Sequence, residues 1–230
     1  SKIRLILYDV KFKMENTINT NYQKIMSEIR TACQNSKRDP NNVKVIAVCK
    51  RQPIRKIKQS IQAGIKLYGE NRIQDAINRW SKIKTENHQL SFIGPLQTNK
   101  SEEAVKLFNI VQSLDREKLA SSLSKAQQKH KKNIEYMVQV NTGNEVQKSG
   151  IKPNEVDNFI KTCKSNYGLN IKGVMCIPPI DENPALHFAF LKKIYQRNKL
   201  EYLSMGMSSD FRTAIEFGAT HIRIGSRLFG

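Results

Sequence analysis

The stretch Val43-Lys44-Val45-Ile46-Ala47-Val48-Cys49-Lys50 is a short apolar, β-branched run that ends in a lysine. Its length and composition predict a buried β-strand. Seven similar runs follow, and several are apolar throughout, as expected of a parallel sheet covered on both faces. The eight predicted strands cover residues 43–49, 65–68, 90–93, 110–113, 134–140, 171–177, 202–205 and 221–224.

The segments between these strands carry apolar residues at helical spacing, which predicts helices. They cover residues 54–63, 73–83, 100–107, 116–128, 153–162, 185–197 and 210–217. Pro153 suits a first helical turn, and Gly64 and Gly218 suit the left-handed residue that ends a helix. Ser208 or Ser209 is the predicted N-cap of the last of these helices.

Strand and helix alternate eight times, which predicts an α/β fold, a single (β/α)₈ TIM barrel. Residues 16–33 are predicted to add an N-terminal helix, because their apolar residues follow helical spacing. We expect residues 1–13 to be an N-terminal extension or a tag remnant, and residues 14–230 to form one domain. A doubly wound open sheet is the alternative, but no Gly-x-Gly-x-x-Gly follows the first strand.

The net charge of +19 indicates either binding to nucleic acid or an anionic membrane, or a solvated lysine-rich surface. We favour the solvated surface, because the cations are dispersed and lack interleaved aromatic residues that would stack on bases. No apolar run approaches the ~20 residues that span a bilayer. We therefore expect a cytoplasmic protein, with a mitochondrial pool as an alternative. The histidines lack metal-ligand spacing, and no metal is predicted.

Active sites of such barrels lie at the carboxyl ends of the strands. Lys50 ends the first strand, so its amine is expected at the barrel mouth above an apolar wall. Partial desolvation there would lower its pKa and free the amine to attack an aldehyde. The alternative is an exposed loop lysine, which is common in a chain this basic.

The loops after the seventh and eighth strands resemble a phosphate cradle. Gly206 and Gly225 allow close backbone approach, and Ser204, Ser208 and Ser226 supply hydroxyl donors. Phosphate sites are frequent at this place in TIM barrels, although glycine and serine are also ordinary loop residues.

Arg223 lies within an otherwise apolar strand, and a buried arginine needs a partner. One interpretation is a structural ion pair. The other is a donor to the pyridine nitrogen of a cofactor, which would keep that nitrogen unprotonated and weaken the ring as an electron sink.

At these strand ends the sequence resembles the pyridoxal phosphate homeostasis proteins over residues 14–230. The segments that carry the resemblance include Val45-Ile46-Ala47-Val48-Cys49-Lys50, Tyr68-Gly69-Glu70-Asn71, Phe92-Ile93-Gly94-Pro95-Leu96-Gln97, Leu203-Ser204-Met205-Gly206-Met207-Ser208 and Ile222-Arg223-Ile224-Gly225-Ser226. They occur in the family's order, and their joint match is highly specific. One departure is Arg51-Gln52-Pro53, where the family usually has Thr-Lys-Pro.

The resemblance implies a barrel like the N-terminal domain of alanine racemase, the fold type III architecture of pyridoxal 5′-phosphate (PLP) proteins. It implies a Schiff base with PLP on Lys50, and Asn71 beside the cofactor. Arg223 would face the pyridine nitrogen, and the phosphate would be held by Ser204, Gly225 and Ser226. The implied role is PLP homeostasis, by cofactor buffering or delivery. We expect transient contact with PLP-dependent apo-enzymes, and a monomer, because the sequence shows no dimerising domain.

Two other functions are open. An amino-acid racemase of this fold needs a second acid/base group from a second domain. We expect no such domain after the barrel and find no tyrosine placed opposite Lys50, so little or no catalysis is predicted. A basic nucleic-acid-binding protein is the second alternative, although no recognition motif supports it.

Overall fold

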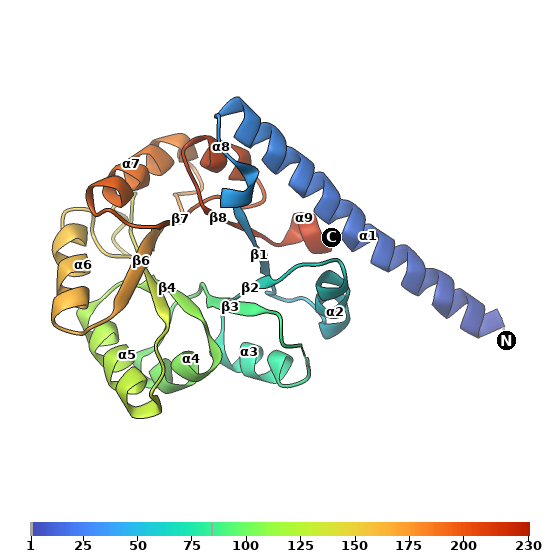
Figure 1. The fold of residues 1–230 in the computed structure, drawn as a ribbon, viewed down its shortest axis with the longest axis horizontal. Helices are drawn as coiled ribbons and strands as arrows, with labels where there is room; N and C mark the ends of the chain where they lie inside the picture. Colours follow the sequence, from blue (N-terminus) through green and yellow to red (C-terminus); the bar gives the residue numbers. More distant parts are fainter. Residues whose placement is uncertain (1, 84) are drawn as a thin grey trace.

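The computed structural model describes residues 2–83 and 85–230, and the side chains of these residues outside 9–16. Eight parallel strands close into a barrel in sequence order, and Figure 1 shows helices around its outside. The predicted TIM barrel is therefore confirmed. The strands are β1 (Lys44–Val48), β2 (Leu67–Glu70), β3 (Gln89–Phe92), β4 (Ile110–Leu114), β5 (Glu135–Gln139), β6 (Asn170–Met175), β7 (Tyr202–Ser204) and β8 (His221–Ile224).

The helices follow their strands as predicted, with small shifts at the ends. Two 3₁₀ turns, Pro40–Asn42 and Thr98–Lys100, precede β1 and α4. The helices are α1 (Lys2–Asn35), α2 (Ile54–Gln62), α3 (Ile73–Trp80), α4 (Ser101–Leu107), α5 (Glu117–His130), α6 (Val156–Ser165), α7 (Pro184–Arg197), α8 (Phe211–Glu216) and α9 (Ser226–Phe229).

The predicted N-terminal helix is present and longer than expected. It begins at Lys2 instead of residue 16, since residues 2–35 contain no glycine or proline to interrupt it. Its C-terminal half packs on the barrel through Ile18, Ile25 and Ile29, all fully buried. The N-terminal part extends away from the barrel (Figure 1).

Some predicted details are wrong. Asp210, and not a serine, is the N-cap residue of α8, and its carboxylate accepts a hydrogen bond from the Met207 amide at 2.7 Å. Pro153 lies in the turn before α6, which begins at Val156. Gly64 and Gly218 do adopt the left-handed conformation expected after a helix, with φ of 94° and 103°.

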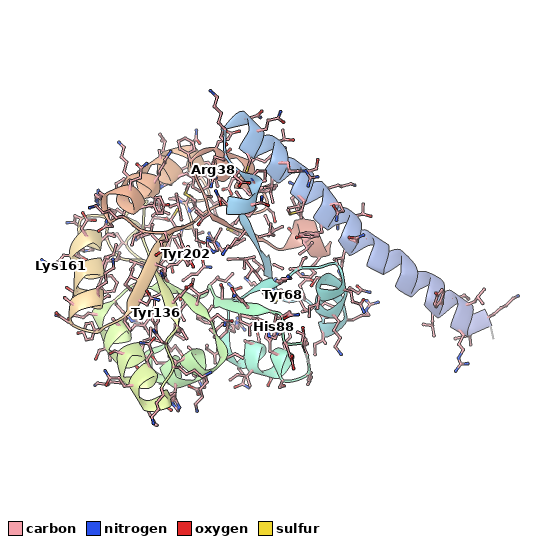
Figure 2. All side chains as sticks on the ribbon, in the orientation of Figure 1. Arg38, Tyr68, His88, Tyr136, Lys161 and Tyr202 are labelled. Atoms are coloured by element: carbon pink, nitrogen blue, oxygen red, sulfur yellow. The ribbon has the colours of Figure 1, made fainter. Side chains whose placement is uncertain are left out.

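Side chains fill two layers, one between strands and helices and one inside the barrel (Figure 2). The inner apolar cluster is small and comprises Ile110, Met137 and Met175, with Tyr202 packed against it. The rest of the interior includes polar side chains of β4, β7 and β8 that bond to each other across the barrel. The inner face is thus less apolar than the strand runs predicted, which leaves polar groups for a site.

Candidate functional site

Lys50 lies at the carboxyl end of β1, where the chain turns toward α2. The Cys49 amide still bonds to the Gly69 carbonyl at 2.9 Å, and the next residues leave the sheet. Arg51 adopts a left-handed conformation with φ of 60°. Lys50 is exposed. The expected partial desolvation of its amine is therefore wrong, because Cys49 is the last buried residue of the run.

A cavity of about 520 Å³ opens between the loops that follow β1 and β2. It brings Lys50 and Asn71 together, as predicted for two residues at neighbouring strand ends. The buried Asn71 Oδ1 has no hydrogen-bond partner among the described residues. The cavity is also lined by Arg51, Gln52, Pro53, Glu70, Arg72, Asp75 and Arg79.

Gly94, in the loop after β3, packs directly against the backbone of Asn71. A Cβ atom at position 94 would lie 2.2 Å from the Asn71 carbonyl oxygen, so only glycine fits here. The close approach fixes the backbone that carries the Asn71 side chain.

Gly94→Ala is expected to lower the free energy of unfolding by about 1–3 kcal/mol, because the added methyl group forces the Asn71 backbone to move. Urea denaturation followed by circular dichroism measures this change. A Gly94→Ala protein as stable as wild type would contradict the packing argument.

The wall of the cavity contains a buried ion pair that the sequence did not reveal. Arg79 Nη1 donates to both oxygens of Glu70, at 2.6 and 2.8 Å, and Trp80 Nε1 donates to Glu70 Oε1 at 2.8 Å. Burial raises the pKa of Glu70, and Arg79 opposes this effect. Arg79 Nη2 also contacts the Gln52 carbonyl at 3.3 Å and so ties the pair to the Lys50 loop.

Arg223 lies inside the barrel, almost fully buried, below the mouth. Its Nη1 donates to Ser204 Oγ at 2.7 Å and its Nη2 to the Cys176 carbonyl at 2.8 Å. Burial lowers its pKa. Among the described residues no carboxylate forms a salt bridge with it. The structural ion pair is thus not what holds this arginine, whose partners are neutral.

Ser204 has a different neighbour from the one expected. Its hydroxyl is fully buried, accepts from Arg223, and donates to Gln112 Oε1 on β4 at 2.6 Å. It orients the guanidinium and is not free for a phosphate. Gln112 was not identified from the sequence. The one signal for it is that a polar amide side chain lies within the buried strand Ile110–Leu114. Its Nε2 is buried without a hydrogen-bond partner among the described residues.

Gly225 and Ser226 lie beside the Lys50 turn. Gly225 packs against Val48, since a Cβ atom there would be 3.5 Å from Val48 Cβ. Ser226 is exposed and begins α9. On the neighbouring loop, the Gly206 carbonyl accepts from the Arg223 amide at 3.0 Å. Lys50, Asn71, Gly225 and Ser226 therefore share the mouth, and Arg223 and Ser204 lie deeper.

Comparison with known proteins decides the family. The profile described as "Alanine racemase, N-terminal domain" matches residues 20–230. A pyridoxal phosphate homeostasis protein of Pasteurella multocida is 36% identical over 226 residues, which cover 93% of this chain and 97% of that protein. Another, of Pseudomonas aeruginosa, is 36% identical over 220 residues, covering 94% and 96%. The chain belongs to the pyridoxal phosphate homeostasis protein family.

A solved structure of the same kind is similar throughout. PipY of Synechococcus elongatus PCC7942, determined with PLP bound, superimposes with a TM-score of 0.80 at 28% identity. The match covers 93% of this chain and all of that one. The barrel of this family member thus has a counterpart in which a cofactor is present.

The described residues contain neither a cluster of metal ligands nor a helix that could span a membrane. No cluster of three or more His, Cys, Asp or Glu side chains in residues 2–83 and 85–230 could hold a metal ion. In the same part of the chain, every helix is too short or too polar to traverse a bilayer.

Proposed function

We propose that this protein binds PLP as a Schiff base on Lys50 and takes part in intracellular vitamin B6 homeostasis, with little or no catalysis. The observation that carries the proposal is the cavity shared by Lys50 and Asn71 at the carboxyl ends of β1 and β2, with Gly225 packed on Val48 of β1 and Arg223 buried inside the barrel. The names of the relatives and the PLP in PipY support it.

The residues present fit this cofactor. Two buried polar atoms, Asn71 Oδ1 and Gln112 Nε2, lack hydrogen-bond partners within the described chain. The buried Arg223 guanidinium is held by neutral groups and can only donate hydrogen bonds. It therefore suits an unprotonated ring nitrogen, which accepts a hydrogen bond, better than a carboxylate at the same place would. What the cofactor supplies is an aldehyde, which condenses with a lysine amine and releases water.

Each residue then has a role set by its position. Lys50 is exposed, so its amine can be reached from solvent when the cofactor is loaded or released. Asn71 lies beside it, and Gly225 and Ser226 hold the phosphate next to β1. Arg223 faces the ring nitrogen and keeps it unprotonated, which weakens the electron sink that catalysis requires.

The further expectations remain part of this proposal. Residues 14–230 form the cofactor-binding barrel and residues 1–13 an extension. The protein acts as a cytoplasmic monomer that buffers PLP or passes it to PLP-dependent apo-enzymes by transient contact. Borohydride reduction of the PLP-loaded protein, followed by peptide mapping, tests the core of the proposal. Reduced cofactor on a lysine other than Lys50 would refute it.

The two serines near the site are expected to respond differently to the cofactor's phosphate. Ser226→Ala removes a phosphate donor and should weaken binding of PLP about fivefold to tenfold, with binding of unphosphorylated pyridoxal unchanged. Ser204→Ala releases Arg223 and should weaken both ligands by a similar factor. Absorbance titrations with the two aldehydes measure this. A loss confined to PLP in Ser204→Ala would instead place Ser204 on the phosphate.

A further inference from the structure

Exposed apolar side chains gather on one part of the barrel mouth. Outside α1, every large hydrophobic side chain that is exposed in the described part of the chain lies on the segments following β5, β6 and β7. These strands are neighbours, so their carboxyl ends lie next to each other on one side of the barrel mouth. The group, called the apolar rim below, comprises Val146 (100% exposed), Ile177 (38%), Ile180 (102%), Leu186 (70%) and Met207 (45%).

The β5–α6 loop that carries Val146 is closed by its own hydrogen bonds. Asn141 Nδ2 donates to the Glu145 carbonyl at 2.8 Å, and the Glu145 amide donates to Asn141 Oδ1 at 3.1 Å. The base of the loop is closed by the Asn141 amide, which bonds to the Ile151 carbonyl at 3.0 Å. Val146 is therefore presented to solvent by an ordered loop.

The neighbouring β6–α7 loop, which carries Ile180, is fastened to the first. His187 is buried and bonds to Thr142 Oγ1 at 2.9 Å and to Glu182 Oε2 at 2.7 Å. Gly143 packs on Pro179, since a Cβ there would lie 2.5 Å from Pro179 Cγ. Apolar side chains held in water by bonded loops are typical of a preformed contact surface.

We propose that the apolar rim is the docking surface for a folded protein partner, a PLP-dependent enzyme in its cofactor-free form. This inference rests on the proposed function. The rim lies at the same, carboxyl end of the barrel as the cavity of Lys50 and Asn71, on the side across from it, so a partner that rests on the rim and spans the mouth covers the cofactor site. The cofactor then passes between two proteins at close range.

Charge and size favour this partner over two others. The exposed Asp181 and Glu182 follow Ile180, which disfavours an anionic membrane surface, whereas Glu145, beside Val146, is paired with Lys148 at 2.8 Å. Five aliphatic side chains offer on the order of a few hundred Å², whereas a stable dimer buries about 800 Å² on each copy. A transient partner fits, one with basic side chains opposite Asp181 and Glu182.

The test compares transfer with release. PLP-loaded protein is mixed with an aminotransferase stripped of its cofactor, and recovery of aminotransferase activity gives the rate of transfer. Release is measured separately, with a phosphatase that destroys free PLP. The rim variant is Val146→Ser with Ile180→Ser. The matched control is Ile3→Ser with Leu5→Ser, two α1 residues that are each 71% exposed.

We expect the rim variant to slow transfer at least about tenfold, with unchanged release and a control equal to wild type. Equal transfer by rim variant and wild type would overturn the docking surface. So would rim-dependent sedimentation with phosphatidylserine vesicles, or a wild-type dimer that the rim variant loses. If the proposed function is wrong, the protein takes up no PLP, and this is seen before any transfer is measured. That result would overturn both the PLP-binding function and the docking surface, and it differs from every outcome above.

Discussion

Lys50→Ala is expected to abolish covalent attachment of PLP while leaving the fold intact. The side chain is exposed, and Lys50 lines the same cavity at the mouth as Asn71. Removing it takes away the nucleophile and nothing that the core depends on. The non-covalent contacts proposed for Arg223, Gly225 and Ser226 are not changed by this substitution, so weak binding of PLP should persist. Mass spectrometry after borohydride reduction should show no adduct in this variant.

Lys58→Ala is the matched control for that experiment, because Lys58 is also exposed and lies on α2, shortly after the Lys50 turn. It should keep the full adduct and the wild-type absorbance spectrum. A full adduct in Lys50→Ala would mean that another amine reaches the aldehyde, and the assignment of the site would be wrong. An equal loss in both variants would point to a general effect of charge on PLP binding.

The fold was predictable because strands and helices have different periods of apolar residues, and the alternation of the two occurs eight times along the chain. The end of β8 was predicted to the residue, since β-branched residues stop at Gly225. β2 lies two residues later than predicted, at Leu67–Glu70. Its apolar residues suggested a start at Ile65, whereas its pairing with β3 continues to Glu70 opposite Phe92. Pairing between strands is a long-range property that a single run of residues does not encode.

The position of the candidate site residues was predictable where residue type and strand end coincide. Lys50, Asn71, Gly225 and Ser226 lie at the carboxyl ends of the strands and Arg223 is buried inside the barrel, as expected, while their contacts with a cofactor stay predictions. Hydrogen-bond partners could not be predicted, because Gln112 and Ser204 are 92 residues apart and meet only across the barrel. For the same reason, Ser204 was expected on the phosphate, although its O–H already donates to Gln112.

The pair of Glu70 and Arg79 is where a single substitution should cost the most stability. Glu70 and Arg79 are only 2% and 11% exposed at their side chains. Arg79→Met keeps most of the volume and leaves the Glu70 carboxylate buried, with Trp80 Nε1 and the Cys49 thiol as its neutral side-chain partners. The expected loss is about 3–5 kcal/mol in the free energy of unfolding near pH 8. Urea denaturation followed by circular dichroism measures it.

The same variant should regain stability on acidification, which separates a charge effect from lost packing. Burial already raises the pKa of Glu70, and removal of Arg79 takes away the group that opposes this. Between the ordinary glutamate pKa and the raised folded value, the folded state holds a proton that the unfolded state has released. Stability therefore falls as pH rises through that window and returns as pH falls.

Arg79→Met combined with Glu70→Gln removes the buried charge and should recover most of the loss at pH 8. A deficit that is the same at pH 5 and pH 8, and that Glu70→Gln does not relieve, would show that Arg79 acts by packing alone.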